Sequence, residues 1–273
     1  MNLFCFGLGY TANHLIRSLS PVKWQFSGSK RTGKNRFNTN EPLQDADKIL
    51  KKVTHLLISI PPDKNISDPV LFHHKKDIEN MPNLKWIGYL SATSVYGNYN
   101  GDWVDEQTPL NPTGQRGKNR LDAEKLWLSL DRPVHIFRLA GIYGPDRNQI
   151  DSVRNGTARK IIKPGHVFSR VHVDDICSAL IRSMEQPAQK EIYNIADDCP
   201  AATADILDFI CQELNLPPIE GELYENSDIS PALRSFYQDN KRVKNDYAKR
   251  DLNWQPKFPS YKEGYRDILT KLV

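Results

Sequence analysis

A glycine-containing segment near the N-terminus carries the strongest chemical signal in this sequence. Residues 7–12 read Gly-Leu-Gly-Tyr-Thr-Ala, which matches the pattern G-x-G-x-x-G/A. The apolar run Leu3 to Phe6 precedes it and predicts a buried strand, and Leu15 and Leu19 follow at helical spacing. A strand, a tight turn and a helix in this order predict a binding site for the diphosphate of a dinucleotide.

The residues of this segment have distinct expected roles. Gly7 permits the sharp turn, Gly9 lets a diphosphate approach the backbone, and Ala12 lets the helix pack closely on the strand. The N–H groups at the start of the helix, at Tyr10 and Thr11, have no helical partner and attract phosphate. The alternative is an ordinary strand-to-helix turn that uses glycine only for its backbone angles.

A basic segment follows the second expected strand, which we place at residues 22–27. Ser29, Lys30 and Arg31 stand about 20 residues after the glycines, where an NAD site carries an acidic residue for the ribose 2′-hydroxyl. A hydroxyl and two cations suit a 2′-phosphate instead, because arginine binds phosphate through two charge-assisted hydrogen bonds. We therefore expect NADP as the cofactor, with NAD as the second possibility. The alternative is a solvated basic loop.

Strand and helix patterns alternate along most of the chain. Further strands are expected at residues 54–60, 85–90, 133–138 and 191–196, and helices at 45–52, 68–80, 112–130 and 176–184. This alternation predicts an α/β fold of the Rossmann type, with a doubly wound parallel sheet. Ligands of such sheets bind at the carboxyl ends of the strands. The further cofactor-binding residues expected there are Ile60, Pro61, Pro62, Ser91, Ala92 and Ala140.

The later part of the chain changes character, since it is rich in polar residues and interrupted by prolines. We expect an NADP-binding Rossmann core at residues 1–149 and 167–198. Residues 150–166 and 199–273 are expected to form a smaller C-terminal substrate-binding lid that closes over the strand ends.

Composition narrows the class of protein. The 273 residues are 39% hydrophobic and 26% charged, as in an ordinary soluble domain. The net charge of +4 indicates neither a nucleic-acid partner nor a membrane surface. No apolar run approaches the length of about 20 residues that spans a bilayer, and no signal peptide is expected. The four cysteines are scattered without ligand spacing, so we expect a cytoplasmic protein without a metal site.

Several segments together resemble the short-chain dehydrogenase/reductase superfamily of the extended or atypical type, and in particular the bacterial NAD(P)-dependent epimerase/dehydratase proteins. Besides the glycine segment, the resemblance rests on residues 90–97 (Leu-Ser-Ala-Thr-Ser-Val-Tyr-Gly), 105–112, 138–145, 170–175, 193–197 and several short tail segments. It covers nearly the whole chain. It implies a nicotinamide cofactor and an active site made of Ser or Thr, Tyr and Lys, the last two as Tyr-x-x-x-Lys.

The sequence departs from this family at all three active-site positions. The family's hydroxyl residue stands three positions before the Val of Val-Tyr-Gly, which is Ala92 here. Glu124 resembles the Glu that follows the family's Lys by four residues. This register places Arg120 at the Lys position and Arg116 at the Tyr position.

The replacements predict altered chemistry. Arginine stays protonated and cannot exchange a proton near neutral pH, so Arg116 cannot act as the family's tyrosine does. It could bind an anionic substrate or stabilise an oxyanion, while Arg120 could donate to the nicotinamide ribose. The candidates for proton transfer or a substitute hydroxyl are Thr93, Tyr96 and Tyr143, although buried tyrosines are more often packing residues.

Two functions remain open from the sequence. One is an NADP-dependent reductase, epimerase or dehydratase with a non-standard active site and a small-molecule substrate, anionic or nucleotide-linked. The other is a catalytically impaired NADP-binding sensor or scaffold protein. A homodimer is also expected, through the helix that carries Arg116, where Leu126, Trp127 and Leu130 could face a second copy.

Overall fold

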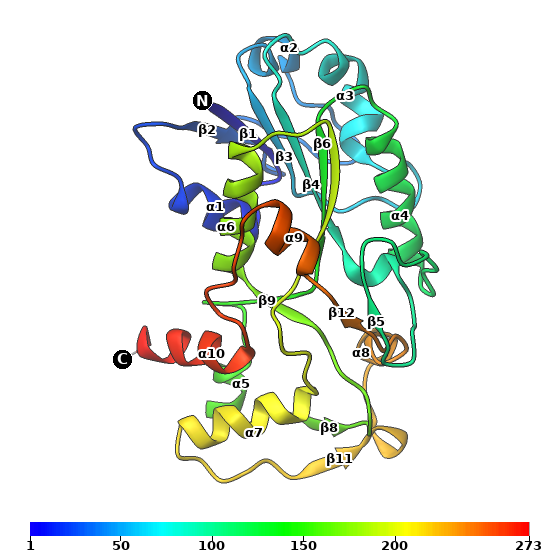
Figure 1. Cartoon of the computed structure of the whole chain (residues 1–273), viewed down its shortest axis with the longest axis vertical. Helices are drawn as coiled ribbons and strands as arrows, with labels where there is room; N and C mark the ends of the chain where they lie inside the picture. The colour runs from blue at the N-terminus through cyan, green and yellow to red at the C-terminus, as the bar shows by residue number, and fades with distance from the viewer. Residues whose placement is uncertain (273) are drawn as a thin grey trace.

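The computed structural model describes residues 1–272 and contains a central sheet of six parallel strands (Figure 1). The strand order is β10-β6-β4-β3-β1-β2. Their bounds are Asn2–Phe6 (β1), Gln25–Gly28 (β2), His55–Ile58 (β3), Trp86–Ala92 (β4), Val134–Leu139 (β6) and Lys190–Ile195 (β10). Since β1 is flanked by β2 on one side and β3 on the other, the order reverses next to β1. Ligands of doubly wound sheets bind at such a reversal.

Helices cover both faces of the sheet, which confirms the expected doubly wound α/β fold (Figure 1). On one face lie α1 (Tyr10–Ser18) and α6 (Val173–Glu185), which pack on each other and on apolar side chains such as Phe137 and Ile195. On the other lie α2 (Ala46–Leu50), α3 (Pro69–Glu79) and α4 (Gln115–Leu128). Strands β3 and β6 are buried on both faces, which explains why apolar and polar residues do not alternate regularly along them.

The expected elements exist, but several boundaries differ. The second strand begins at Gln25 rather than at Val22, whose side chain is exposed. Helix α4 begins at Gln115 because Gly114 has an extended backbone, with φ −99° and ψ 158°, and serves as its N-cap. Helix α3 begins as expected after Asp68, whose side chain accepts a hydrogen bond from the N–H of Leu71.

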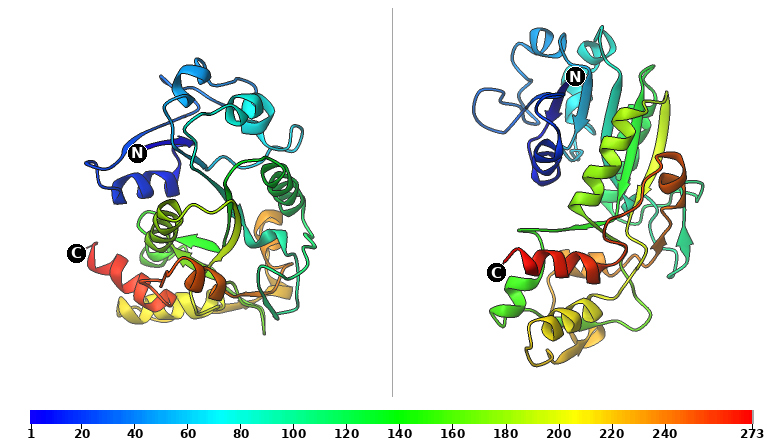
Figure 2. Two further views of the ribbon diagram at one scale, coloured as in Figure 1. Left: turned by 45° about the horizontal axis from the view of Figure 1, so that its top comes forward. Right: turned by 60° about the vertical axis from the view of Figure 1, so that its left-hand side comes forward.

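A second group of elements lies beyond the carboxyl ends of the strands (Figures 1 and 2). Helices α5, α7 and α10 pack together there around apolar residues that include Ile150, Ile206 and Tyr265. The bounds of the remaining helices are Ile150–Arg154 (α5), Thr203–Glu213 (α7), Pro231–Phe236 (α8), Asp246–Asp251 (α9) and Tyr261–Thr270 (α10), of which α9 packs on sheet strand β10. The division into core and lid at the expected residues stays a prediction.

Three two-stranded parallel pairs complete the fold. They are β5 (Trp103–Val104) with β12 (Arg242–Val243), β7 (Gly141–Tyr143) with β9 (Arg170–His172), and β8 (Lys160–Ile162) with β11 (Gly221–Leu223). Two 3₁₀ helices, η1 (Thr93–Val95) and η2 (Tyr224–Asn226), are also present. The pair of β12 with β5 ties the C-terminal chain to a segment that follows β4, whereas β8 and β11 pair with each other in the group beyond the sheet.

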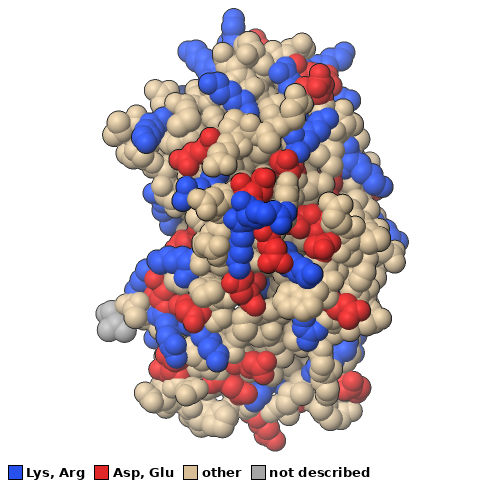
Figure 3. Space-filling view, viewed as in Figure 1, with Lys and Arg blue, Asp and Glu red and all other residues tan. Residues whose placement is uncertain are grey.

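Surface and helix composition bear on the expected partners. None of the helices within residues 1–272 has the length and apolarity needed to cross a lipid bilayer. On the face seen in Figure 1, basic and acidic side chains are intermixed (Figure 3).

Of the three residues expected at a dimer interface, only Leu126 is exposed. Trp127 and Leu130 are buried in the core, which corrects the expectation for these two.

Candidate cofactor site at the strand ends

The turn after β1 depends on Gly7. Its φ of +92° lies in the region that side-chain-bearing residues avoid, and an added Cβ would lie 2.8 Å from Cγ1 of Ile60. Its N–H donates a hydrogen bond of 3.0 Å to Oγ of Ser29, and the N–H of Leu8 donates to the carbonyl oxygen of Ser29 at 2.9 Å. The ends of β1, β2 and β3 are therefore held together at one point.

Gly9 provides the open surface that a diphosphate needs. It is the N-cap residue of α1, with φ −90°, and no side chain caps the helix. A Cβ added to Gly9 would have Oγ of Ser59, at 3.9 Å, as its nearest neighbour. The first turn of α1 has no acidic residue. Uncapped N–H groups and the helix dipole favour an anion at this place, so these residues fit a dinucleotide.

The rest of the glycine segment supports the turn. Thr11 and Ala12 are buried against the sheet, while Tyr10 is partly exposed at the start of the helix. Only the backbone N–H groups of these residues can therefore contact a phosphate, apart from the side chain of Tyr10.

The structure corrects the expectation for Ser29. Its side chain is fully buried and its hydroxyl accepts the hydrogen bond from Gly7, so it stabilises the glycine turn and does not reach a ligand. Lys30 and Arg31 are exposed beside it. Arg36 of the same loop forms an ion pair with Glu41 at 3.1 Å, whereas no ion pair is recorded for Lys30 or Arg31 within residues 1–272.

The other strand ends meet at the same edge of the sheet. Ile60 contacts the glycine turn, and Pro61 and Pro62 follow it at the surface. Ala92 lies at the end of β4, in register with Leu139 of β6. Ala140 is buried, and its N–H donates to the carbonyl oxygen of Ile195 at 3.0 Å.

The structure also corrects the expectation that Ser91 binds the cofactor. Its hydroxyl is buried and donates to Oε1 of Glu124, so its side chain contributes to the interior and not to a ligand site.

Arg116 and Arg120 lie one turn apart on α4. The guanidinium of Arg120 donates a 2.6 Å hydrogen bond to the carbonyl oxygen of Leu90 and lies 5.9 Å from the ring centroid of Tyr89. Arg116 is exposed, and its side chain has no recorded ion pair or hydrogen bond in the described chain. Gly117 allows this helix to lie close to η1, because an added Cβ would be 2.5 Å from the carbonyl oxygen of Ser94.

The structure removes Tyr96 as an accessible acid. It is fully buried, donates to Oδ1 of Asn194 at 2.7 Å and accepts from Nη1 of Arg138 at 3.0 Å. Burial raises the pKa of its hydroxyl to about 12 despite the nearby arginine.

Tyr143 is likewise corrected, because it lies in the packed group beyond the sheet. Its ring stacks on Tyr265 at 5.3 Å, and burial raises its pKa far above the usual value. Of the hydroxyl candidates, Thr93 stays in place at the strand end, where it is half-buried at the start of η1.

Sequence reasoning missed a buried polar network behind the strand ends. Arg138 of β6 forms an ion pair with Glu124 of α4, and β6 sets it in register with Ser91 of β4 and Asn194 of β10. The N–H of Asn194 donates to Oε1 of Glu106 at 2.7 Å. The signal in the sequence was an arginine within a mostly apolar strand, since a buried charge requires a partner.

The structure also brings together three residues of types that bind metal ions, which the sequence did not predict. One ligand atom each of His172, Asp174 and Asp267 lies within 4.8 Å of the others. Asp267, however, forms ion pairs with Lys271 at 2.6 Å and with Lys257 at 3.8 Å. These ammonium groups neutralise the carboxylate, so we assign no metal to this group.

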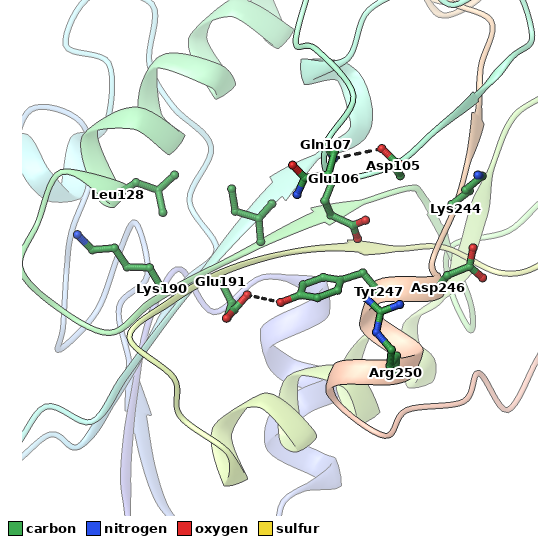
Figure 4. Close-up of a pocket in the computed structure, with 11 residues that line it drawn as sticks. Asp105, Glu106, Gln107, Leu128, Lys190, Glu191, Lys244, Asp246, Tyr247 and Arg250 are labelled. Atoms are coloured by element: carbon green, nitrogen blue, oxygen red, sulfur yellow. Dashed lines mark hydrogen bonds between the residues drawn. The ribbon is translucent and has the colours of Figure 1, made fainter.

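One pocket lies elsewhere, beside edge strand β10 (Figure 4). It has a volume of about 530 Å³ and is lined by charged residues of both signs, among them Glu106, Lys190 and Arg250. Tyr247 donates to Glu191 at 2.6 Å across it. Because it contains none of the residues expected to bind the cofactor, it is separate from the candidate site.

Comparison with known proteins identifies the fold family. A functionally unknown conserved protein from Silicibacter pomeroyi is 40% identical, with a TM-score of 0.92 over 99% of this chain and 98% of that chain. The two chains belong to one family. No family model matches the chain.

More distant similarities concern the sequence of a bacterial protein and the fold of a solved structure. Protein YeeZ of Escherichia coli (strain K12) is 29% identical over 211 residues, which are 69% of this chain and 75% of that protein. UDP-glucuronic acid 4-epimerase from Bacillus cereus, solved with UDP-glucuronic acid and NAD, has a TM-score of 0.77 at 16% identity, with 100% of both chains covered. The expected resemblance to extended short-chain dehydrogenase/reductase proteins is therefore confirmed in the fold, which is that of the NAD-dependent epimerases and dehydratases.

Proposed function

We propose that this protein binds NADP(H) at the strand ends and acts on an anionic, nucleotide-linked small molecule through a non-standard active site. The observation that carries this proposal is the open surface at Gly9, in front of the uncapped start of α1. A nicotinamide dinucleotide is also the cofactor named for the Bacillus cereus epimerase. The preference for NADP rests on the exposed cations Lys30 and Arg31 and on the lack of an acidic residue after β2.

Different residues of the chain would contact different parts of the cofactor. The backbone at Gly7, Gly9 and Tyr10 would hold the diphosphate, with Lys30 and Arg31 at the 2′-phosphate. Ile60, Pro61, Pro62, Ala92 and Ala140 would border the bound molecule, and Arg120 would donate to the nicotinamide ribose with the guanidinium donors that Leu90 does not use. When bound, the nicotinamide would supply or accept hydride.

In the proposed active site, the positive charge of Arg116 would take the place of a tyrosine that donates a proton. Arg116 is exposed and stays protonated, so it can bind a substrate anion or stabilise negative charge on oxygen. Thr93 would provide a hydroxyl at the end of β4, next to the Ala92 position that lacks one. Elements α5, α7 and α10, within residues 150–166 and 199–273, would close over this edge as the substrate lid (Figure 1).

Substrate class follows from the free cation and from the named relatives. Arg116 favours an anionic substrate, and the Bacillus cereus epimerase binds UDP-glucuronic acid. The alternative function, a sensor or scaffold without turnover, is not favoured by the comparison, because the Bacillus cereus protein of the same fold is an epimerase. We therefore propose an oxidoreductase, epimerase or dehydratase.

The test uses Gly9→Ala, because a Cβ at this position meets no close neighbour in the folded chain. Gly114→Ala is a matched control, since Gly114 is also a helix N-cap without a side-chain cap and has nothing within 4 Å of an added Cβ. Both variants should fold and lose a similar, small amount of stability. Only Gly9→Ala should bind NADPH more weakly in calorimetric titration. Equal binding by the two variants would refute the proposed site.

A second measurement tests the substrate. The protein with NADPH or NADP is incubated with UDP-glucose, UDP-glucuronic acid and simple ketones, and products are identified by mass spectrometry. Conversion of a nucleotide sugar, lost in Arg116→Gln while NADPH affinity is retained, is the expected result. Conversion that Arg116→Gln leaves unchanged would remove Arg116 from the active site.

A further inference from the structure

Tyr10 connects the glycine turn to a loop that is far away in the sequence. It is the first residue of α1, and its hydroxyl donates a 2.7 Å hydrogen bond to the carbonyl oxygen of Pro145. Gly144 makes room for this contact, because a Cβ there would lie 2.6 Å from the Tyr10 hydroxyl. The loop at residues 144–147 is thereby fixed beside the N-terminus of α1.

Arg147 closes this loop and faces the same aromatic ring. Gly144 and Arg147 exchange two backbone hydrogen bonds of 3.1 Å. The guanidinium carbon of Arg147 lies 5.6 Å from the ring centroid of Tyr10, within the range of a cation–π contact. The contact with the Tyr10 ring therefore restricts the orientation of the Arg147 side chain.

The donors of Arg147 are unused by the protein. The residue is exposed, and no ion pair or side-chain hydrogen bond of its guanidinium is recorded within residues 1–272. Asp146 and Asp174 carry carboxylates near Tyr10, yet neither forms an ion pair with Arg147. Since the ring of Tyr10 occupies one face of the guanidinium, its N–H groups remain free to bind an anion in the plane.

We propose that Arg147 binds the diphosphate of the dinucleotide, positioned for this by Tyr10. This inference rests on the proposed function and adds a residue to the cofactor site that lies far in sequence from the glycine segment. The N–H groups of α1 and the guanidinium of Arg147 would bind the same diphosphate from two sides. Arg31, by contrast, would contact only the 2′-phosphate.

This division of roles gives different expectations for the two cofactors. NAD and NADP share the diphosphate, so Arg147→Ala should weaken the binding of both by the same factor, about 10- to 100-fold for one lost charge-assisted contact. Arg31→Ala should weaken NADP alone. Arg250→Ala is the matched control, because Arg250 is also exposed and lies 5.5 Å from the ring centroid of a tyrosine, Tyr247. It should bind both cofactors as the unaltered protein does.

The experiment is calorimetric titration of the full chain and these three variants with NAD, NADP and UDP-glucuronic acid. If the unaltered protein binds neither dinucleotide, the proposed function fails. If it binds them and Arg147→Ala binds them equally well, the present inference fails and the proposed function stands. Loss of UDP-glucuronic acid binding alone in Arg147→Ala would also overturn it, because the cation would then serve the substrate. Equal weakening for NAD and NADP supports it.

Discussion

Glu124 of α4 and Arg138 of β6 form an ion pair in the interior, with Nη2 of the arginine 2.9 Å from Oε2 of the carboxylate. Their side chains are 2% and 3% exposed. Ser91 donates to the same carboxylate, and Tyr96 accepts from the same guanidinium at 3.0 Å. The pair therefore anchors α4, which carries Arg116 and Arg120, to the strands whose ends form the candidate site.

Breaking this pair should destabilise the fold strongly. Arg138→Met leaves the charge of Glu124 buried without its partner, and we expect a loss of about 3–5 kcal/mol in the free energy of unfolding, measured with urea. The double variant with Glu124→Gln should recover part of this loss. Arg159→Met is the control, because the ion pair of Arg159 with Glu222 is exposed and should contribute less than about 1 kcal/mol. Similar losses for both single variants would contradict this account.

Cofactor preference should depend on Arg31. In Arg31→Ala, the loss of a charge-assisted contact with the 2′-phosphate should reduce the binding free energy of NADP by about 1.5–3 kcal/mol, with little change for NAD. Arg36→Ala is the control in the same loop, since Arg36 is already paired with Glu41. Equal calorimetric affinity of the unaltered protein for both cofactors would remove the NADP preference.

Reduction of simple ketones should be slow even when NADPH binds. Arg116 stands at the expected tyrosine position, Tyr96 and Tyr143 are buried, and general acid catalysis is typically worth about 10²–10⁴-fold in rate. NADPH consumption with several unrelated ketones should therefore stay close to the rate without substrate. Rapid reduction of these ketones would mean that another group donates the proton.

Stability should decrease as the pH rises from about 4 to about 8, through Asp197. Burial raises the pKa of this carboxyl to about 8, and only its Oδ1 has a recorded partner, the N–H of Cys199 at 3.1 Å. The folded state therefore holds a proton that the unfolded state releases near its usual pKa of about 4. The contribution of this group is fully present below that value and is lost as the pH passes through the folded pKa.

Asp197→Asn isolates this effect. The amide keeps the acceptor for Cys199 and cannot ionise, so the variant should lose less stability than the unaltered protein between pH 4 and pH 8. Asp175 remains in this variant, and burial raises the pKa of its carboxyl to about 6. The variant should therefore still lose some stability as the pH rises, but less than the unaltered protein does. Unfolding by urea at several pH values measures the difference, and parallel curves for both proteins would exclude Asp197 as its source.

A homodimer stays a prediction, now with a smaller contact. Leu126 on α4 is 42% exposed and Phe72 on α3 is 62% exposed, whereas Trp127 and Leu130 are buried. We expect light scattering at tens of micromolar to show a dimer that Leu126→Glu disrupts, because the new charge would be desolvated in the interface. A monomer for the unaltered chain would end this proposal.

The sequence by itself determined the features that arise from neighbouring residues. The turn at Gly7 and Gly9, the apolar strands before it and after it, and the cap at Asp68 all follow from spacing over a few positions. Alternation of these local patterns was enough to predict a parallel sheet with helices on both faces, because few other arrangements bury such strands. The cations Lys30 and Arg31 are exposed after β2, and their contact with a 2′-phosphate stays a prediction.

Only the tertiary structure decided which side chains remain free to act. Ser29 reads as a phosphate ligand until the fold brings its hydroxyl to the N–H of Gly7, 22 residues away. Tyr96 reads as a possible acid until Arg138 and Asn194 occupy its hydroxyl, and Arg147 had no assigned role until Tyr10 came beside it. Periodicity shows which face of an element is buried. It does not show which distant partner that face meets, because that is set by how strands and helices pack in three dimensions.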